Sequence, residues 1–317
     1  MRIMKAIFNK YIITFGIVCL LSNLAGVSLA SERKLQVLTS TSDLKSITEF
    51  IGGDKVEVNS IAVGYQDAHF VEAKPSYMLK ARNADLFIKI GMDLEIGWEN
   101  LILEGARNSK ILVGTIGHLD ASGGIEKLDV PLGSIDRSMG DIHPLGNPHY
   151  WLDPLNAKII VANIAERLSR ILPQDESYFK QNLLEFNKKI DQKMIEWQDK
   201  LSPFKGNSIA IYHRSWTYFA NRFGLNISCE LEPKPGIAPS PGHLKEVIET
   251  IKQKGVKVIL MEVFYDEKPA RFVAGQTGAK VVIVPNSVGG TKEAKDYLSL
   301  IDTIVDKLIE AMRVLKK

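Results

Sequence analysis

Short apolar runs alternate with amphipathic stretches along most of the chain. The runs have the length of strands that are buried on both faces, and the stretches between them carry apolar residues at helical spacing. We predict strands over 35–39, 56–63, 84–90, 110–113, 208–212, 256–261 and 279–284. We predict helices over 42–51, 75–83, 156–171, 217–223, 243–254, 269–277 and from 292 onward. This alternation is typical of an α/β protein with parallel sheets.

One polar segment, from about 176 to 201, repeats apolar residues every three to five positions. A helix of that length is long for a globular domain, and it spans too few heptads for a coiled-coil arm. We therefore predict a rigid connecting helix within 174–203. It would join an N-terminal lobe (31–173) to a C-terminal lobe (204–317), two similar α/β lobes that each have a core of their own.

The first thirty residues have the pattern of a secretory signal peptide. Three basic residues and no acid precede an apolar run over 11–21, and Ser28 and Ala30 are small enough for a cleavage site. The run is too short for a transmembrane anchor. A lipid anchor on Cys19 would need a small residue before it, where Val18 stands. We predict export to the periplasm.

Charge and cysteine content narrow the classes of partner and site. The chain has 40 Lys and Arg against 37 Asp and Glu. The three bases of the signal segment account for the whole excess, so the mature chain is balanced and gives no reason to expect nucleic acid or an anionic membrane as a partner. After cleavage only Cys229 remains, which excludes an intramolecular disulfide and a cysteine-rich metal site.

Three of the six histidines lie at predicted strand or helix ends. His69 follows the second strand, His149 precedes the helix 156–171, and His213 follows the strand 208–212. Open α/β sheets bind ligands beyond the carboxyl ends of their strands, so distant histidines can converge there. Imidazole suits zinc, copper, iron and nickel better than magnesium or calcium. The pattern predicts a transition-metal site.

The segment 147–154, Asn-Pro-His-Tyr-Trp-Leu-Asp-Pro, resembles the Asp-Pro-His-x-Trp-Leu-Asp-Pro block of the zinc and manganese solute-binding proteins of ABC importers. The resemblance covers essentially the whole mature chain. Its other matching segments are His69 with Lys74-Pro75-Ser76, His213 with Tyr218-Phe219-Ala220 and Phe223-Gly224-Leu225, Ser240-Pro241, and Glu262 with Lys268-Pro269. It implies two α/β lobes joined by one rigid helix, with a divalent metal in the cleft between them. It also implies a monomer that delivers the ion to a membrane permease and is not an enzyme.

By position, the resemblance implies that His69, His149 and His213 are metal ligands. The aspartate that the family usually adds falls on Asn286, whose amide is a weaker zinc ligand than a carboxylate. We predict that Glu262, at the end of the strand 256–261, supplies the fourth ligand, with water and His143 as further alternatives. A helix-capping or hinge role for Glu262 is the competing interpretation. Three imidazoles and one carboxylate favour zinc, and manganese is the alternative cargo.

Two other functions are weighed against metal delivery. A periplasmic metallo-hydrolase would use Glu262 as general base beside a metal-bound water. A metal-dependent surface adhesin would use the same fold to bind protein. Around the ligands, Asp67 and Glu72 could orient His69, although solvated loop acids are common, and Asp153 is predicted to cap the helix that follows it. His118 and His243 match no motif and are predicted on the surface.

Overall fold

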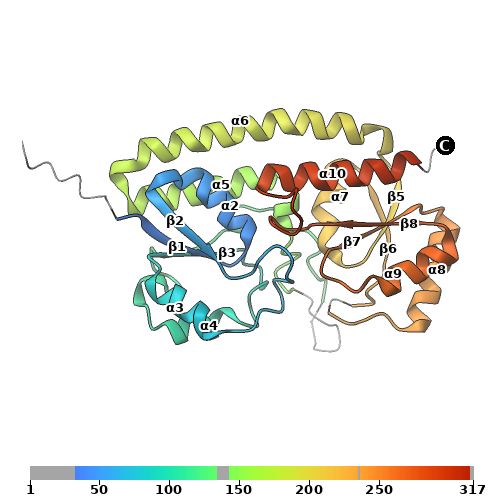
Figure 1. Cartoon of the computed structure of the whole chain (residues 1–317), viewed down its shortest axis with the longest axis horizontal. Coiled ribbons are helices and arrows are strands. Elements are labelled where there is room, and N and C mark those ends of the chain that lie inside the picture. Colours follow the sequence, from blue (N-terminus) through green and yellow to red (C-terminus); the bar gives the residue numbers. More distant parts are fainter. Residues whose placement is uncertain (1–32, 134–142, 235, 315–317) are drawn as a thin grey trace, which may run out of the picture. The chain divides into compact units, whose positions relative to one another are not determined.

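The computed structural model describes residues 33–133, 143–234 and 236–314 (Figure 1). The described residues from Leu35 onward belong to one compact unit. The predicted signal peptide and Cys19 lie outside the described residues. Within the described ranges, no helix has the length and apolar character needed to cross a membrane.

The first half of the larger unit contains a parallel sheet with strand order β2-β1-β3-β4. Its strands are β1 (Leu35–Thr39), β2 (Val56–Ser60), β3 (Leu86–Lys89) and β4 (His118–Asp120). The helices of this half are α2 (Ser42–Gly52), α3 (Pro75–Asn83), α4 (Glu99–Ala106) and α5 (Pro154–Ile171). Strands with a side chain buried on each face need helices on both sides, and α2 and α3 both contact β1.

The second half repeats this topology with strand order β6-β5-β7-β8. Its strands are β5 (Ser208–Ile211), β6 (Asn226–Glu230), β7 (Val258–Glu262) and β8 (Lys280–Val284). Its helices are α7 (Thr217–Phe223), α8 (Pro241–Lys254), α9 (Glu267–Thr277) and α10 (Tyr297–Val314). In both sheets the first strand in sequence lies between the second and the third. The prediction of two similar α/β lobes is confirmed.

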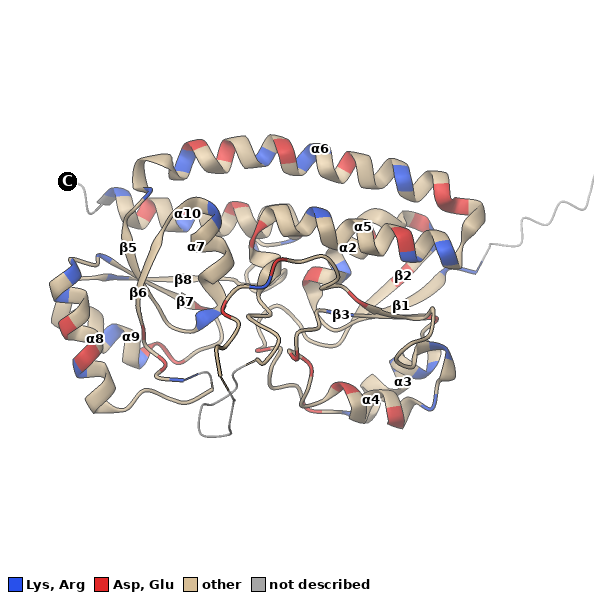
Figure 2. Ribbon diagram, turned by 180° about the vertical axis from the view of Figure 1, so that it is seen from behind, with Lys and Arg blue, Asp and Glu red and all other residues tan. Residues whose placement is uncertain are grey.

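Helix α6 (Glu176–Leu201) packs on α2 and α5 of one lobe and on α10 of the other. Near its start, the Asn182 amide donates to the Ile51 carbonyl at 2.9 Å. Near its end, the Trp197 indole donates to Asp302 of α10 at 2.8 Å. Figure 2 shows charged residues of both signs along α6. The helix lies inside the predicted connector, and the lobe boundaries themselves stay a prediction.

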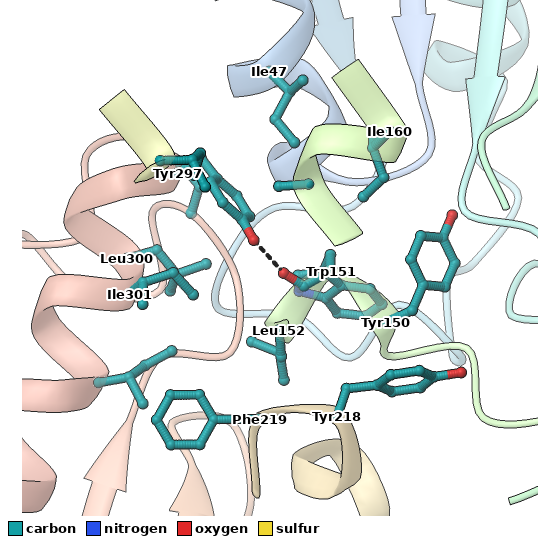
Figure 3. Packing of buried hydrophobic residues seen from close by; sticks show 14 of the residues in the cluster. Ile47, Tyr150, Trp151, Leu152, Ile160, Tyr218, Phe219, Tyr297, Leu300 and Ile301 are labelled. Atoms are coloured by element: carbon teal, nitrogen blue, oxygen red, sulfur yellow. Dashed lines mark hydrogen bonds between the residues drawn. The ribbon is translucent and has the colours of Figure 1, made fainter. Parts of the chain in front are cut away.

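The largest hydrophobic cluster runs through both lobes (Figure 3). Trp151 and Leu152 lie at its middle, between Ile160 of the first lobe and Phe219 of the second, and the Tyr297 hydroxyl of α10 donates to the Trp151 carbonyl. Two smaller clusters cover the far faces of the sheets, one under α3 and α4 and one under α8 and α9. The prediction of a separate core for each lobe is therefore wrong on the side of the sheets that α6 covers, where one hydrophobic cluster is shared by both lobes.

Two local predictions differ from the structure. The predicted strand 110–113 is replaced by a 3-10 helix, Ser109–Ile111, and the edge strand β4 comes later. The prediction failed because it took the apolar residues of this segment as buried, whereas Val113 is 71% exposed. His118 is buried in β4 and pairs with Glu99 at 2.9 Å, whereas the sequence placed it on the surface. Helix α4 and strand β6 were not predicted.

Candidate metal site

Three loops that follow strands or precede helices carry the candidate ligands. His69 lies between β2 and α3, His213 directly follows β5 and Tyr212, and His149 precedes the 3-10 helix Tyr150–Leu152. Side-chain oxygens fix two of these loops. Asp67 accepts from the backbone N–H of His69 at 3.0 Å, and Asn147 accepts from that of His149 at 2.9 Å. Such local turns set the direction of the His69 and His149 imidazoles before any ion binds.

The three imidazoles converge. One donor atom from each of His69, His149 and His213 lies within 4.8 Å of the other two. Their ring centroids are 5.1, 5.2 and 5.4 Å apart. His149 and His213 are buried and His69 is partly buried. Within the described part of the chain, this is the one group of histidine, cysteine or acidic side chains with metal-binding geometry.

Each of these histidines has its Nδ1 engaged by a side-chain oxygen. His69 Nδ1 lies 2.6 Å from Asp67 Oδ1, and His213 Nδ1 lies 2.6 Å from Glu232 Oε2. His149 Nδ1 lies 2.9 Å from Asn147 Oδ1. An ionised carboxylate only accepts hydrogen bonds, so Nδ1 carries the proton in His69 and His213. The Nε2 lone pairs are then free for an ion, which is the usual arrangement around a metal-bound histidine.

Electrostatics favour the neutral imidazole of His149 and the charged carboxylate of Asp67. Burial, together with the charges of His69 and His213, holds the pKa of His149 well below its usual 6.5. Burial alone would raise the pKa of Asp67, but the hydrogen bonds from the ring and the backbone of His69 outweigh it and lower this pKa. Neutral imidazoles with anionic partners are the protonation states that bind a metal ion.

A fourth histidine adjoins the group. His143 Nε2 lies 3.1 Å from His69 Nε2, and the two ring centroids are 5.1 Å apart. Burial and the charges of His69 and His213 lower the pKa of His143 to about 3, so this ring is neutral too. The backbone of Asp93 hydrogen-bonds to the ring. A cavity of about 300 Å³ is lined by His143, His149 and His213 and gives access to the group.

Residues 37–311 match a family model described as the zinc-uptake complex component A, periplasmic. The chain belongs to this family. The predicted family resemblance is thereby confirmed. Members of the zinc-uptake component A family are substrate-binding proteins of metal ABC transporters and are not enzymes.

Similar proteins include members of this family that are named for different metals. The manganese ABC transporter substrate-binding lipoprotein PsaA of Streptococcus mitis is 26% identical over 318 residues, 98% of this chain and 99% of its own. The iron-binding protein YfeA of Yersinia pestis is 27% identical over 287 residues, 87% of this chain and 86% of its own. The crystal structure of ZnuA has a TM-score of 0.74 and 25% identity, covering 88% of this chain and 99% of ZnuA. Zinc, manganese and iron all occur among these names, so the chemistry of the site has to identify the metal.

Asn286, at the position of the family's aspartate, and Glu262, the predicted substitute for it, are both buried, and Glu262 does not belong to the histidine group. Glu262, the last residue of β7, is fully buried, and neither carboxyl oxygen has a hydrogen-bond partner. The Ser215 hydroxyl is a polar neighbour of Glu262 without forming a hydrogen bond of good geometry. Burial raises the pKa of Glu262 to about 8, which favours the neutral carboxyl. Asn286 accepts a hydrogen bond from the Trp151 indole through its backbone carbonyl at 2.8 Å, and its Oδ1 has no partner.

The carboxylates around the group differ from those that the sequence suggested. Asp67 does bind His69, whereas the Glu72 side chain is 83% exposed and pairs loosely with Lys74. Glu232, which holds His213, was not predicted. It follows the edge strand β6, which has no apolar run, and only the recognition of that strand could have drawn attention to an acid at its end. Asp153 caps α5 as predicted, accepting from the backbone of Leu155 at 2.9 Å.

Proposed function

We propose that this member of the zinc-uptake component A family captures one zinc ion through Nε2 of His69, His149 and His213 and delivers it to an ABC permease. The observation that supports this is the convergence of three buried imidazoles whose Nδ1 atoms are all engaged by side-chain oxygens. Such an arrangement fixes the tautomer and the ring orientation at every ligand, which leaves little reorganisation for the ion to impose.

The donor set favours zinc over manganese. The group contains only imidazole nitrogens, and no carboxylate oxygen belongs to it among the described residues. Imidazole is a good ligand for zinc, whereas manganese prefers carboxylate, carbonyl and water oxygens. A tetrahedral zinc with Zn–N bonds of about 2.0–2.1 Å separates its ligand nitrogens by about 3.3 Å. The 3.1 Å between His69 Nε2 and His143 Nε2 is close to that separation.

We propose His143 as the fourth donor, with Glu262 as the alternative that the sequence favoured. His143 presents a neutral imidazole directly to His69. Glu262 would have to lose the proton that burial favours and reach the group from the end of β7. Binding of a nearby dication would lower the pKa of Glu262, so the geometry weighs more in this choice than the protonation state.

Export to the periplasm follows from the signal-peptide pattern and suits this role. The ion would be captured outside the inner membrane by a monomer and released when the protein docks on the permease.

Metal analysis of protein isolated from the periplasm without chelator tests the cargo. Zinc binds more tightly than manganese at most nitrogen sites, so a higher zinc affinity in vitro would not by itself identify the cargo. The metal that the protein carries in the cell is the stronger test. We expect about one zinc per chain, with X-ray absorption showing only nitrogen donors at about 2.0–2.1 Å. His243→Ala, a histidine that bonds to the Glu230 carbonyl outside the group, is the matched control for His149→Ala. Manganese in the isolated protein, or zinc retained by His149→Ala, would overturn the proposal.

A further inference from the structure

A second cavity, of about 530 Å³, is lined in part by the two carboxylates that hold the histidines, Asp67 and Glu232. We name it the aromatic cavity. Its aromatic walls come from both lobes: Tyr65, Phe70 and Tyr77 from the first, and Tyr212, Phe264 and Tyr265 from the second. Tyr212 and Tyr265 are stacked with ring centroids 4.5 Å apart, and Phe264 packs on Tyr265 at 4.8 Å.

The charged groups that line the aromatic cavity are three carboxylates and one ammonium: Asp67, Glu72, Glu232 and Lys74. Lys74 lies 3.9 Å from Glu72, so these two largely offset each other. Asp67 and Glu232 remain, and the Tyr265 hydroxyl reaches Asp67 Oδ2 at 3.5 Å. The cavity thus combines aromatic faces with a net negative charge.

No histidine lines the aromatic cavity, whereas His143, His149 and His213 line the smaller one. The aromatic cavity therefore does not duplicate the access route of the metal ion. Asp67 and Glu232 line it and also bond to the Nδ1 of a proposed ligand, His69 or His213. Phe70 and Tyr265 line it as well, and their rings lie 6.1 Å from those of His69 and His213.

We propose that the aromatic cavity binds an organic cation, an ammonium or guanidinium group on an apolar stem, and that this cation weakens the hold of the protein on its metal. Aromatic faces attract such cations, and carboxylates form charge-assisted hydrogen bonds with them. The part of the proposal that concerns the metal rests on the proposed function; the binding of the cation does not.

The coupling follows from the shared carboxylates. A cation that bonds to Asp67 and Glu232 withdraws negative charge from the hydrogen bonds to His69 and His213. The imidazoles then become less basic ligands, and the cation also repels the dication. Coupling of two binding events is reciprocal, so metal must weaken cation binding by the same factor. A free solute and a basic side chain of the permease share this chemistry.

Binding is tested on metal-free protein with n-butylguanidinium, a permanent cation that cannot coordinate zinc. Calorimetry should show one site, and the neutral isostere n-butylurea should bind about tenfold more weakly or not at all. Phe264→Ala should reduce the affinity, while Phe272→Ala, an aromatic residue of α9 that is 54% exposed and outside the cavity, should not. Equal affinity for the two probes, or equal loss in the two variants, would overturn the proposal.

A second pair of variants avoids the risk that Phe264→Ala alters the fold. Glu72→Gln leaves the Lys74 ammonium uncompensated in the aromatic cavity, so it should weaken n-butylguanidinium binding severalfold while zinc affinity stays unchanged. Glu246→Gln is its matched control, because the Glu246 side chain is 80% exposed on α8 and the Glu72 side chain is 83% exposed. An unchanged affinity in Glu72→Gln, with the fold intact by melting temperature, would contradict the proposed electrostatics.

The link to metal is measured by competition titration of zinc in saturating n-butylguanidinium chloride, with potassium chloride at equal ionic strength as control. Zinc affinity should fall about fivefold or more. An unchanged zinc affinity would overturn the coupling, while loss of zinc binding in both salts would instead refute the proposed function.

Zinc uptake by cells distinguishes the two sources of the cation, the permease and a free solute. If cells with Glu72→Gln take up less zinc than cells with Glu246→Gln in medium without added amines, the cation is a basic side chain of the permease. If the two variants differ in zinc uptake only when arginine or a polyamine is added, the cation is a free solute. Uptake that matches Glu246→Gln in all media would reject both sources.

Discussion

Replacing Glu232 with Gln tests whether the orienting hydrogen bonds matter as much as the ligands themselves. Glu232 is buried and its Oε2 lies 2.6 Å from His213 Nδ1. Gln has nearly the same shape, so it removes the charge with little change in packing. An amide can also turn its NH₂ toward Nδ1, which would place the imidazole proton on Nε2 and block the lone pair that zinc needs.

The expected loss can be worked out from the types of hydrogen bond. A bond to a charged group contributes about 1.5–3 kcal/mol and a neutral one about 0.5–1.5 kcal/mol, so the exchange costs about 1 kcal/mol or more. The altered tautomer balance adds to this cost. Outer partners of metal-bound histidines are typically worth about 10–100-fold in affinity, or about 1.4–2.7 kcal/mol. We expect Glu232→Gln to weaken zinc binding within that range.

The assay is competition for zinc with a chelating dye at pH 7.5, because direct titration does not resolve tight binding. His213→Ala sets the upper limit of the loss, and Glu185→Gln, on the exposed face of α6, is the neutral control. If Glu232→Gln binds zinc as tightly as Glu185→Gln while His213→Ala is impaired, the carboxylate does not tune the ligand. If Glu232→Gln strongly lowers the melting temperature of the metal-free protein, the loss of zinc affinity results from a destabilised fold and not from the altered hydrogen bond.

Three further outcomes are expected. His143→Ala should weaken zinc binding by about tenfold or more, since it removes a nitrogen donor, and Glu262→Gln should weaken it less; the reverse order in dye competition would identify Glu262 as the fourth ligand. The raised pKa of Glu262, about 8, means that the folded state keeps a proton that the unfolded state releases near pH 4.5. The unfolding free energy should therefore fall between pH 5 and 8 by on the order of 3 kcal/mol from this group, and denaturant titrations should show a smaller fall in Glu262→Gln. Gly64→Ala should destabilise the protein by about 2 kcal/mol or more, because a Cβ would lie 2.1 Å from the Val288 carbonyl and 2.3 Å from the Gly290 nitrogen; an unchanged melting temperature would contradict this contact.

Sequence patterns predicted the elements whose signal is local. Helix α6 and helix α7 begin and end where periodicity and flanking residues placed them. The strand β1 matches the predicted apolar run 35–39. The two helices repeat apolar residues at helical spacing, and β1 is a short apolar run of strand length. The edge strand β6 has neither, because only one of its sides pairs with a neighbouring strand and its residues are exposed or half-buried.

The candidate site was predictable to the extent that its residues belong to motifs. His69, His149 and His213 each follow from a strand end and a matching segment, and the structure brings their rings together. Glu232 and His143 reach the same place through tertiary structure alone. Glu232 follows an edge strand, and His143 lies in irregular chain before His149, so no spacing along the chain distinguishes them from other acids or histidines. The shared core under α6 is equally a property of the packing between distant elements.

The contacts between the lobes limit how the ion can leave. Asp43 of α2 accepts from the Val288 backbone at 2.9 Å, and Ser42 donates to the Val288 carbonyl at 2.7 Å. Asp153 forms a bidentate pair with Arg222 of the second lobe, both bonds at 2.7 Å. A wide hinge motion would have to break these bonds and expose part of a continuous hydrophobic core, which costs roughly 25 cal/mol for each Å² of apolar surface. Small changes at the ligands need none of this. Release by displacing hydrogen bonds around the imidazoles therefore agrees better with this fold than release by opening the lobes.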